Sequence, residues 1–179
     1  MSFVKKILNR LNSKYLTLCY KTIKLEKNAI LDYRCEIESK TNISMGKKSI
    51  LYKHVSIYKN REGKLKIGAK SHIAPYGYFL LVSKKITIGD NVAIAKNCSF
   101  FCSTNSIPLD DSTLYKDSYH EGDINIGNNV FIGVNCVVLP NTVIEDGVVI
   151  AANSTIKGHL KKGCLYGGNP VKKIKKVFR

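Results

Sequence analysis

His120 is the residue of this chain best suited to acid–base chemistry. It lies near the end of a polar stretch, residues 101–125, and Glu121 and Asp123 follow it closely. An imidazole titrates near neutral pH, and a neighbouring carboxylate can orient it and raise its basicity, so the group can take a proton from a hydroxyl. Two alternatives stay open: an exposed loop histidine, or a histidine that binds an acceptor without moving a proton.

The other residue types that bind metals are scattered along the chain. His54, His72 and His159 lie far apart, whereas a zinc enzyme needs three ligands that converge on one ion. The six cysteines include no CxxC pair and no framework spacing. We therefore expect no bound metal, and reduced cysteines of the kind found in cytoplasmic proteins.

The charge balance predicts an anionic partner. The 179 residues include 29 Lys and Arg against 13 Asp and Glu, a formal net charge of +16, and basic residues crowd both ends. Such a surface attracts a phosphorylated small molecule, a membrane surface or nucleic acid. Because the sequence contains no recognisable nucleic-acid-binding module, we do not expect nucleic acid as the partner. Many individual lysines simply keep the surface solvated.

The C-terminal part contains a six-residue repeat. Aliphatic residues recur at this spacing six times in succession, and mostly small residues recur four places after each of them. The aliphatic series is Ile126, Ile132, Val138, Ile144, Ile150 and Ile156, and the second series is Val130, Cys136, Thr142, Val148, Ser154 and Leu160. Neither a helix nor an alternating strand has this period. It predicts a solenoid in which each hexad forms one flat side and three sides close a triangular coil.

The repeat divides the chain into two predicted parts. Residues 1–22 form a helical segment, because an apolar stripe flanked by lysines predicts an amphipathic helix over 3–20. Such a helix packs against its own domain or a neighbouring subunit, or else lies on a membrane surface. Residues 23–179 form the solenoid domain. The N-terminus has no long apolar run, which predicts neither a signal peptide nor a membrane span. With the reduced cysteines we expect a cytoplasmic location, and the basic helix allows a place at the inner face of the membrane.

Three interruptions of the repeat are predicted. Residues 60–63 form a turn between flat sides, and the polar stretch 101–125 forms a long loop that leaves the solenoid. After the last hexad, Gly168 and Pro170 predict a tight turn. Residues 171–177 then suit a short basic helix that caps the open end of the solenoid.

With these features the chain resembles the hexapeptide-repeat acyltransferases, which fold as left-handed parallel β-helices. The likeness is to the galactoside, maltose and xenobiotic O-acetyltransferases and to polysaccharide O-acetyltransferases. It is carried by ITIGDNVAIAKN at 86–97, the hexad block at 126–156 and GGNPVKKIK at 167–175. The resemblance implies a homotrimer that binds acetyl-CoA in the grooves between neighbouring prisms.

The resemblance also implies roles for individual positions. Phe131 stands where the family has an aromatic wall of the acceptor pocket. Contacts to CoA come from the positions that match Val134, Ala152, Lys157, Lys172 and Lys175. The two tail lysines have a physical reason to be there, since ammonium groups can meet the 3′-phosphate and the pyrophosphate of CoA. Asp110 and Asp111, in the loop, are candidates for binding sugar hydroxyls.

The chain departs from the family at the catalytic histidine. The family's general base stands in the loop after the coil that contains IAKNCSF, where this sequence has Asn105 or Ser106, depending on the alignment. Neither side chain accepts a proton unaided near neutral pH. We therefore expect His120 to replace it in an acetyl-CoA-dependent O-acetyltransferase that acts by direct transfer on a sugar hydroxyl, in a surface polysaccharide or its precursor. The alternative is a binding or scaffold subunit that kept the prism and lost catalysis.

Overall fold

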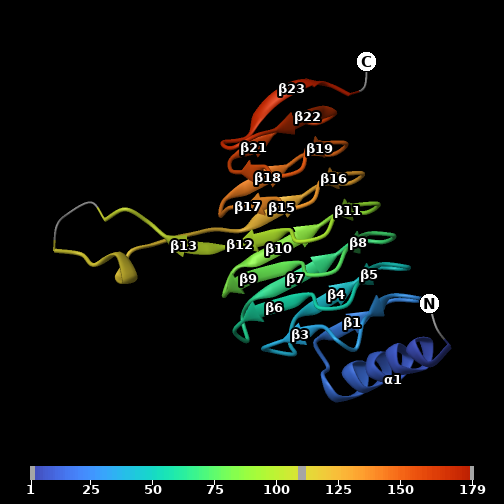
Figure 1. Cartoon of the computed structure of the whole chain (residues 1–179). Helices are drawn as coiled ribbons and strands as arrows, with labels where there is room; N and C mark the ends of the chain where they lie inside the picture. The colour runs from blue at the N-terminus through green and yellow to red at the C-terminus, as the bar shows by residue number, and fades with distance from the viewer. Residues whose placement is uncertain (1–2, 109–111, 178–179) are drawn as a thin grey trace.

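The protein is a prism of three parallel sheets with one helix across its N-terminal end (Figure 1). A computed structural model describes residues 3–108 and 112–177. The chain visits the sheets, here named A, B and C, in a fixed order. The coil strands pair in parallel with the strands one coil before and after them, and only the last strand of sheet B pairs antiparallel among the strands of these three sheets in the described residues. The predicted fold class, a left-handed parallel β-helix, is confirmed.

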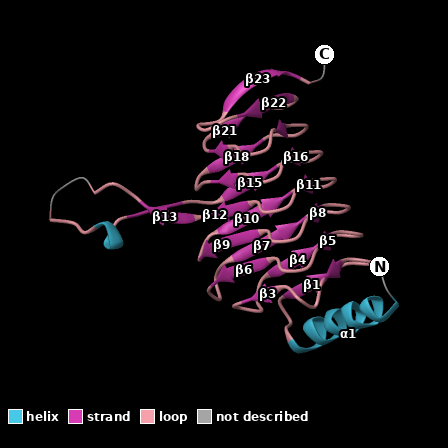
Figure 2. Cartoon of the chain, in the orientation of Figure 1, coloured by secondary structure: helices cyan, strands magenta, loops and turns pink. Residues whose placement is uncertain are grey.

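The strands are short, as hexads require, and turns of a few residues join them (Figure 2). Sheet A contains β1 (Ile23–Leu25), β4 (Ile43–Met45), β7 (Lys64–Ile67), β10 (Lys85–Ile88), β15 (Ile124–Ile126), β18 (Thr142–Ile144) and β21 (His159–Leu160). Sheet B contains β2 (Ile30–Leu31), β5 (Ile50–Leu51), β8 (His72–Ile73), β11 (Ala93–Ile94), β16 (Phe131–Ile132), β19 (Val149–Ile150), β22 (Cys164–Gly167) and β23 (Lys172–Lys176). Sheet C contains β3 (Glu36–Ile37), β6 (Ser56–Lys59), β9 (Tyr78–Val82), β12 (Ser99–Phe101), β17 (Val137–Val138) and β20 (Thr155–Ile156).

Both series of hexad residues form the core, as predicted. No residue of either series is more than 3% exposed, so the aliphatic series fills the axis and the second series fills the corners. In the regular coils, partners such as Ile124 and Thr142 are 18 residues apart, which is three hexads per coil. Fully burying one such aliphatic side chain stabilises the fold by about 1.5–3 kcal/mol.

Asparagine shapes many of the corners. Eight of the thirteen non-glycine residues with a positive φ among the described residues are asparagines, including Asn129, Asn135, Asn141 and Asn153 in the C-terminal coils. Asparagine tolerates the left-handed conformation better than other residues with a Cβ, because its short amide can bond to the local backbone. The abundance of asparagine in the sequence is thus a consequence of the many sharp turns.

The irregular coils lie where the hexads change phase. Ile43 and Leu65 are register partners 22 residues apart, and the additional residues lie in the predicted turn 60–63, between β6 and β7. Ile86 and Ile124 are partners 38 residues apart, because the chain between them leaves the prism and returns. The predicted long excursion is therefore confirmed, and the stacking of sheet A continues without a break across it.

The two ends of the prism differ from each other. α1 (Phe3–Cys19) packs on β1 and β2, close to the predicted helix bounds. The predicted C-terminal helix over 171–177 is wrong, since β23 pairs antiparallel with β22 as the last strand of sheet B. A seven-residue helix is marginal in isolation, whereas the open edge of β22 offers backbone groups that need partners.

Candidate functional site

The candidate site begins at a hairpin that projects from the prism between sheets C and A (Figure 1). The hairpin pairs β13 (Ser103–Asn105) with β14 (Tyr119–Glu121) and carries the 3₁₀ turn η1 (Tyr115–Asp117). Its base is fixed at Cys102, whose amide donates to the Leu80 carbonyl at 2.8 Å and whose carbonyl accepts from the Gly122 amide at 2.9 Å. The outgoing strand is therefore tied directly to the prism, and the returning strand is tied to the outgoing one.

His120 lies in the returning strand of this hairpin, opposite Thr104. Its Nε2 is 3.4 Å from Nδ2 of Asn141, which belongs to the turn between β17 of sheet C and β18 of sheet A. The same Nδ2 donates to the Glu121 carbonyl at 3.1 Å, which fixes the orientation of the amide. An amide nitrogen can only donate, so Nε2 is the accepting atom in this contact. The contact is long enough for an arriving hydroxyl to replace it.

Asn141 also packs against the base of the hairpin. A Cβ added to Gly122 would overlap the Asn141 side-chain amide, so the absence of a side chain at position 122 is what lets the amide reach His120. Asn141 was not among the residues predicted to form the site. In the sequence it looks like one more turn asparagine, six residues after Asn135, and no local pattern distinguishes the two.

The acidic neighbours of His120 have other partners. Glu121 accepts from Ser103 Oγ at 3.3 Å and pairs with Lys84 Nζ at 3.1 Å. Asp123 Oδ1 accepts from the Lys85 backbone amide at 2.9 Å. The expectation that a sequence neighbour would orient the imidazole is therefore not met by these contacts. Alternation along β14 points Glu121 away from the face that carries His120, and an amide from the next coil lies there instead.

Asn105 and Ser106, which align with the family's missing histidine, brace the hairpin. Asn105 Nδ2 donates to the Tyr115 carbonyl at 2.8 Å, and Ser106 Oγ lies 2.6 Å from Ser118 Oγ. Asn105 faces Tyr119 across the hairpin, one register position from His120. The hairpin thus brings the aligned position and the imidazole onto facing strands. Asp110 and Asp111 lie outside the described residues.

The residues predicted to contact the donor lie on another part of the surface. Val134 and Ala152 occupy equivalent turns, one coil apart, between sheets B and C, and Val134 is 38% exposed. Phe131 stands on the outer face of β16, three residues before Val134, and is 46% exposed. These side chains therefore form an open strip along the edge where sheets B and C meet.

The predicted phosphate-binding lysines lie at the C-terminal end of the prism. Lys172 pairs with Gly167 and Lys175 with Leu165 in the β22–β23 ladder, and both side chains are exposed. Lys157 instead lies in the turn between β20 and β21, on the edge between sheets C and A. This is the same edge of the prism that carries Asn141 and His120.

One chain therefore does not gather all the predicted site residues. His120 and Lys157 lie on the edge between sheets C and A, whereas Val134 and Ala152 lie on the edge between sheets B and C. The width of sheet C separates the two groups. If they act together, two copies of the chain must place these edges against each other.

The remaining histidines have local partners. His159 Nε2 lies 2.6 Å from Glu145 Oε1, and His54 stacks on Tyr76 with ring centroids 5.2 Å apart. His72 meets the ring of Tyr52 edge to face. These contacts agree with the structural or exposed roles that the sequence suggests for the three.

Comparison with known proteins finds a family model that matches the regular C-terminal coils. Residues 123–158 match the model of the bacterial transferase hexapeptide, with six repeats. These residues carry the hexapeptide repeat that the model describes. It is 32% identical over 117 residues to a "Probable macrolide acetyltransferase" of Lysinibacillus sphaericus, covering 56% of this chain and 65% of the relative. It is 35% identical over 96 residues to the "Putative lipopolysaccharide biosynthesis O-acetyl transferase WbbJ" of Escherichia coli, covering 54% and 46%.

Solved structures extend the likeness over nearly the whole length of the chain. A variant of AntD, an N-acyltransferase from Bacillus cereus in complex with dTDP and coenzyme A, aligns with a TM-score of 0.79 at 25% identity and covers 93% of this chain and 90% of that one. By contrast, the matched part of the chain spans less than two thirds of the length of either sequence relative. The likeness in fold thus covers nearly the whole chain, whereas the likeness in sequence covers about half of it.

Proposed function

We propose that the protein is an acetyl-CoA-dependent O-acetyltransferase that acts on a sugar hydroxyl. The observation that carries the proposal is His120, whose Nε2 contacts the Asn141 amide at the base of a hairpin that projects from a hexapeptide-repeat prism. The relatives named as acetyltransferases support the acyl group, and the lipopolysaccharide O-acetyl transferase supports a saccharide acceptor.

The residues on the strip between sheets B and C fit the donor. A pantetheine arm needs an apolar edge with nearby backbone groups, and Val134 and Ala152 provide such an edge. The phosphates need cations, and Lys172 and Lys175 expose ammonium groups at the end of the same prism. The AntD variant that shares the fold was crystallised with coenzyme A, which supports a CoA thioester as donor.

The active site requires two copies of the chain. The base on the edge between sheets C and A, and the donor strip between sheets B and C, are separated by sheet C within one chain. A trimer in which each edge between C and A meets the neighbouring edge between B and C would assemble three equivalent sites. Closed cyclic symmetry makes such repeated head-to-tail contacts possible.

The proposed reaction is direct transfer. His120 Nε2 takes the proton of the acceptor hydroxyl as its oxygen attacks the thioester carbonyl carbon. The carbon–sulfur bond then breaks, and the imidazolium returns the proton to the departing CoA thiolate. Asn141 orients the ring through its contact with Nε2, and the acceptor hydroxyl takes the place of the amide before proton transfer. General-base assistance of this kind contributes about 10²–10⁴-fold to the rate.

The test is release of the CoA thiol from acetyl-CoA in the presence of a panel of neutral sugars and amino sugars. We expect turnover with at least one hydroxyl acceptor, and a kcat about 10²–10⁴-fold lower for His120→Ala. His159→Ala is the matched control, because this exposed histidine faces Glu145 and should leave turnover unchanged. Full activity of His120→Ala would remove His120 as the base.

A second candidate is N-acylation of an amino sugar. The observation that favours it is the likeness to the AntD variant, an N-acyltransferase bound to dTDP and coenzyme A, over 93% of the chain. Its test is the same panel, in which turnover only with amino sugars identifies the nitrogen acceptor. No turnover with any acceptor, together with binding of coenzyme A, would instead favour the scaffold role.

A further inference from the structure

α1 packs on the prism with its polar side. Asn9 Oδ1 accepts from the Tyr33 amide at 3.0 Å, and Asn12 Nδ2 donates to the Leu31 carbonyl at 3.2 Å. Lys5 pairs with the buried Asp32 carboxylate at 3.4 Å. Asn9 and Leu16 are the helix residues that are buried. This orientation is the reverse of an ordinary surface helix, which turns its apolar side to the core.

The apolar side of α1 consequently faces solvent. Its members recur at spacings of three, four and seven residues, which places them on one face of the helix. They are Phe3, Val4, Ile7, Leu8, Leu11, Tyr15 and Leu18, all exposed, with Phe3 at 77% and Leu18 at 81%. We call these residues the outer face of α1. Contiguous exposed apolar surface of this kind marks an interaction site.

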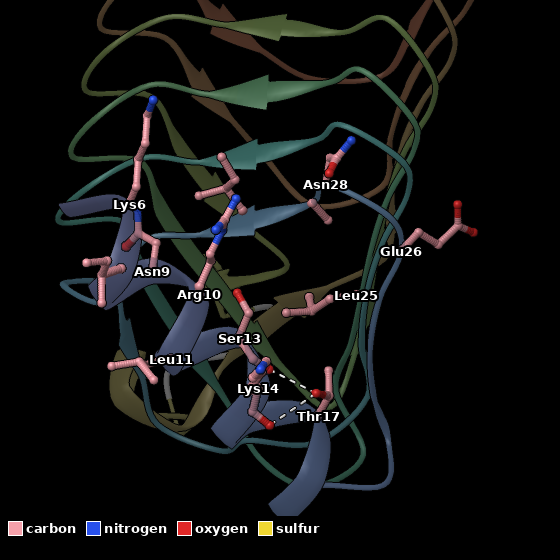
Figure 3. A pocket seen from close by; sticks show the side chains of 13 residues that line it. Lys6, Asn9, Arg10, Leu11, Ser13, Lys14, Thr17, Leu25, Glu26 and Asn28 are labelled. Carbon is pink, nitrogen blue, oxygen red and sulfur yellow. Dashed lines mark hydrogen bonds between the residues drawn. The ribbon is translucent and has the colours of Figure 1, made fainter. Parts of the chain in front are cut away.

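A row of cations borders the outer face. Lys6, Arg10 and Lys14 follow one another at four-residue spacing, so they lie along one side of the helix (Figure 3). They line a hollow of about 780 Å³ between α1 and the first coil, whose other lining residues include Leu25 and Ile30. None of the three forms an ion pair within the described part of the chain, and the helix contains no acidic residue.

We propose that the outer face of α1 and its cation row bind the surface of an anionic lipid bilayer. A helix with an apolar face and flanking lysine or arginine lies in the interface, with its apolar side among the acyl chains and its cations among the headgroups. No helix in the described residues is both long and apolar enough to cross a membrane.

Charge favours a bilayer over a second copy of the chain. Two outer faces packed together would bring two rows of Lys6, Arg10 and Lys14 close to each other without a carboxylate in either helix. The net charge of +16 would add to this repulsion, whereas it draws the whole molecule toward an anionic surface. α1 also lies at the end of the prism opposite β23, so the tail lysines stay away from the lipid (Figure 1).

The test measures co-sedimentation of the full chain with mixed phosphatidylglycerol–phosphatidylcholine vesicles and with pure phosphatidylcholine vesicles. We expect binding to the anionic vesicles that weakens as salt is raised. The triple substitution Lys6→Gln, Arg10→Gln and Lys14→Gln should lower the partition coefficient by roughly 100-fold. The control Lys64→Gln, Lys66→Gln and Lys85→Gln removes the same charge from exposed lysines on sheet A and should have a much smaller effect.

A second variant tests the apolar part of the surface. Leu8→Gln with Leu11→Gln keeps the charge and the helix propensity, and should lower partitioning at least about 10-fold. Light scattering in the absence of lipid shows whether these variants change the oligomeric state. The proposal is overturned if wild type ignores anionic vesicles, or if the cation-row and control triples bind alike. A changed oligomeric state with unchanged vesicle binding would assign the outer face to subunit contact instead.

Discussion

The regular coils over 126–160 and the hairpin over 103–121 are built on opposite principles. In the coils, each inward side chain is buried against neighbours one hexad and one coil away, so position in the repeat decides the structure. In the hairpin, side chains are mostly exposed and a few hydrogen bonds hold them. Asn141 joins the two regions, since it belongs to a coil turn and contacts His120. The prism therefore fixes where the hairpin stands, and the hairpin carries His120, the candidate base.

The strongest test of this difference places the same substitution, isoleucine to alanine, in both regions. Ile132 is fully buried in β16 between its register partners Ile94 and Ile150, whereas Ile107, just beyond β13, is 82% exposed. Ile132→Ala should lower the free energy of unfolding by about 2–5 kcal/mol, because it leaves a cavity in the axis. Ile107→Ala should change it by less than about 0.5 kcal/mol. Denaturant titrations of the two variants give the comparison.

The coils were predictable because their signal is local and repeated. Six aliphatic residues at one spacing specify the inward face without knowledge of any partner, and all six are buried. The hairpin offered no such signal: the sequence indicates a polar excursion but not that His120 would face Thr104 and meet Asn141. Those contacts join residues about 20 positions apart, and they depend on how the excursion returns to the prism.

The N-terminal coil provides a second test, through the buried carboxylate that holds α1. Burial of Asp32 raises its pKa, but hydrogen bonds from the Arg34 side chain and amide, and the charges of Arg34 and Lys5, outweigh it and lower the pKa from 3.8 to about 2. The folded protein therefore binds this proton less readily than the unfolded chain. The resulting stabilisation, about 2 kcal/mol, is present above pH 3.8 and is lost as the pH falls through about 2.

Asp32→Asn measures this contribution. The variant should unfold more easily at neutral pH, and the difference in unfolding free energy from wild type should shrink as the pH falls below 3.8. In this variant the backbone amides of α1 should exchange faster before those of the coils do. The reason is that Lys5 of α1 pairs with Asp32, and Asn9 of α1 accepts from the amide of Tyr33, the residue after Asp32. A constant difference across that pH range would mean that the carboxylate does not stabilise this end of the prism.

The predictions that fail concern the two ends of the chain, where the six-residue repeat no longer specifies the structure. The tail residues 171–177 suit a helix by charge and length, but the open edge of β22 captures them as a strand. α1 was predicted, yet its orientation was not, because Asn9 and Asn12 look like solvent-facing residues until their partners at Tyr33 and Leu31 are known. In both cases specific backbone partners, which the sequence pattern does not reveal, decide the structure.

A third test concerns the contact between Asn141 of the coil and His120 of the hairpin. Gly122→Ala places a methyl group where the Asn141 amide lies, so it should displace Asn141 without removing His120. We expect kcat to fall about 10-fold, with the pH dependence of the rate altered because the imidazole loses its fixed donor. Asn141→Ala should have a similar effect on kcat. If both variants retain the wild-type rate and pH profile, Asn141 serves only the turn.

The smallest expected effect concerns the basic strand at the other end of the prism. Lys172 and Lys175 are exposed, so each contact with a CoA phosphate is discounted by solvent, and together they are worth about 1 kcal/mol. Lys172→Gln with Lys175→Gln should therefore raise the KM for acetyl-CoA about 5–10-fold and leave kcat unchanged, as expected when a contact is equally strong before and during the reaction.

Comparing acetyl-CoA with its 3′-dephospho form identifies the interaction directly. Wild type should prefer the intact donor, and the double variant should lose part of that preference, since removing either partner abolishes the same contact. Lys64→Gln with Lys66→Gln, on sheet A, is the control and should keep the preference. An unchanged preference in the tail variant would leave the 3′-phosphate without these partners. The lysines of β23 would then act as surface charge in the same way as those of the coils.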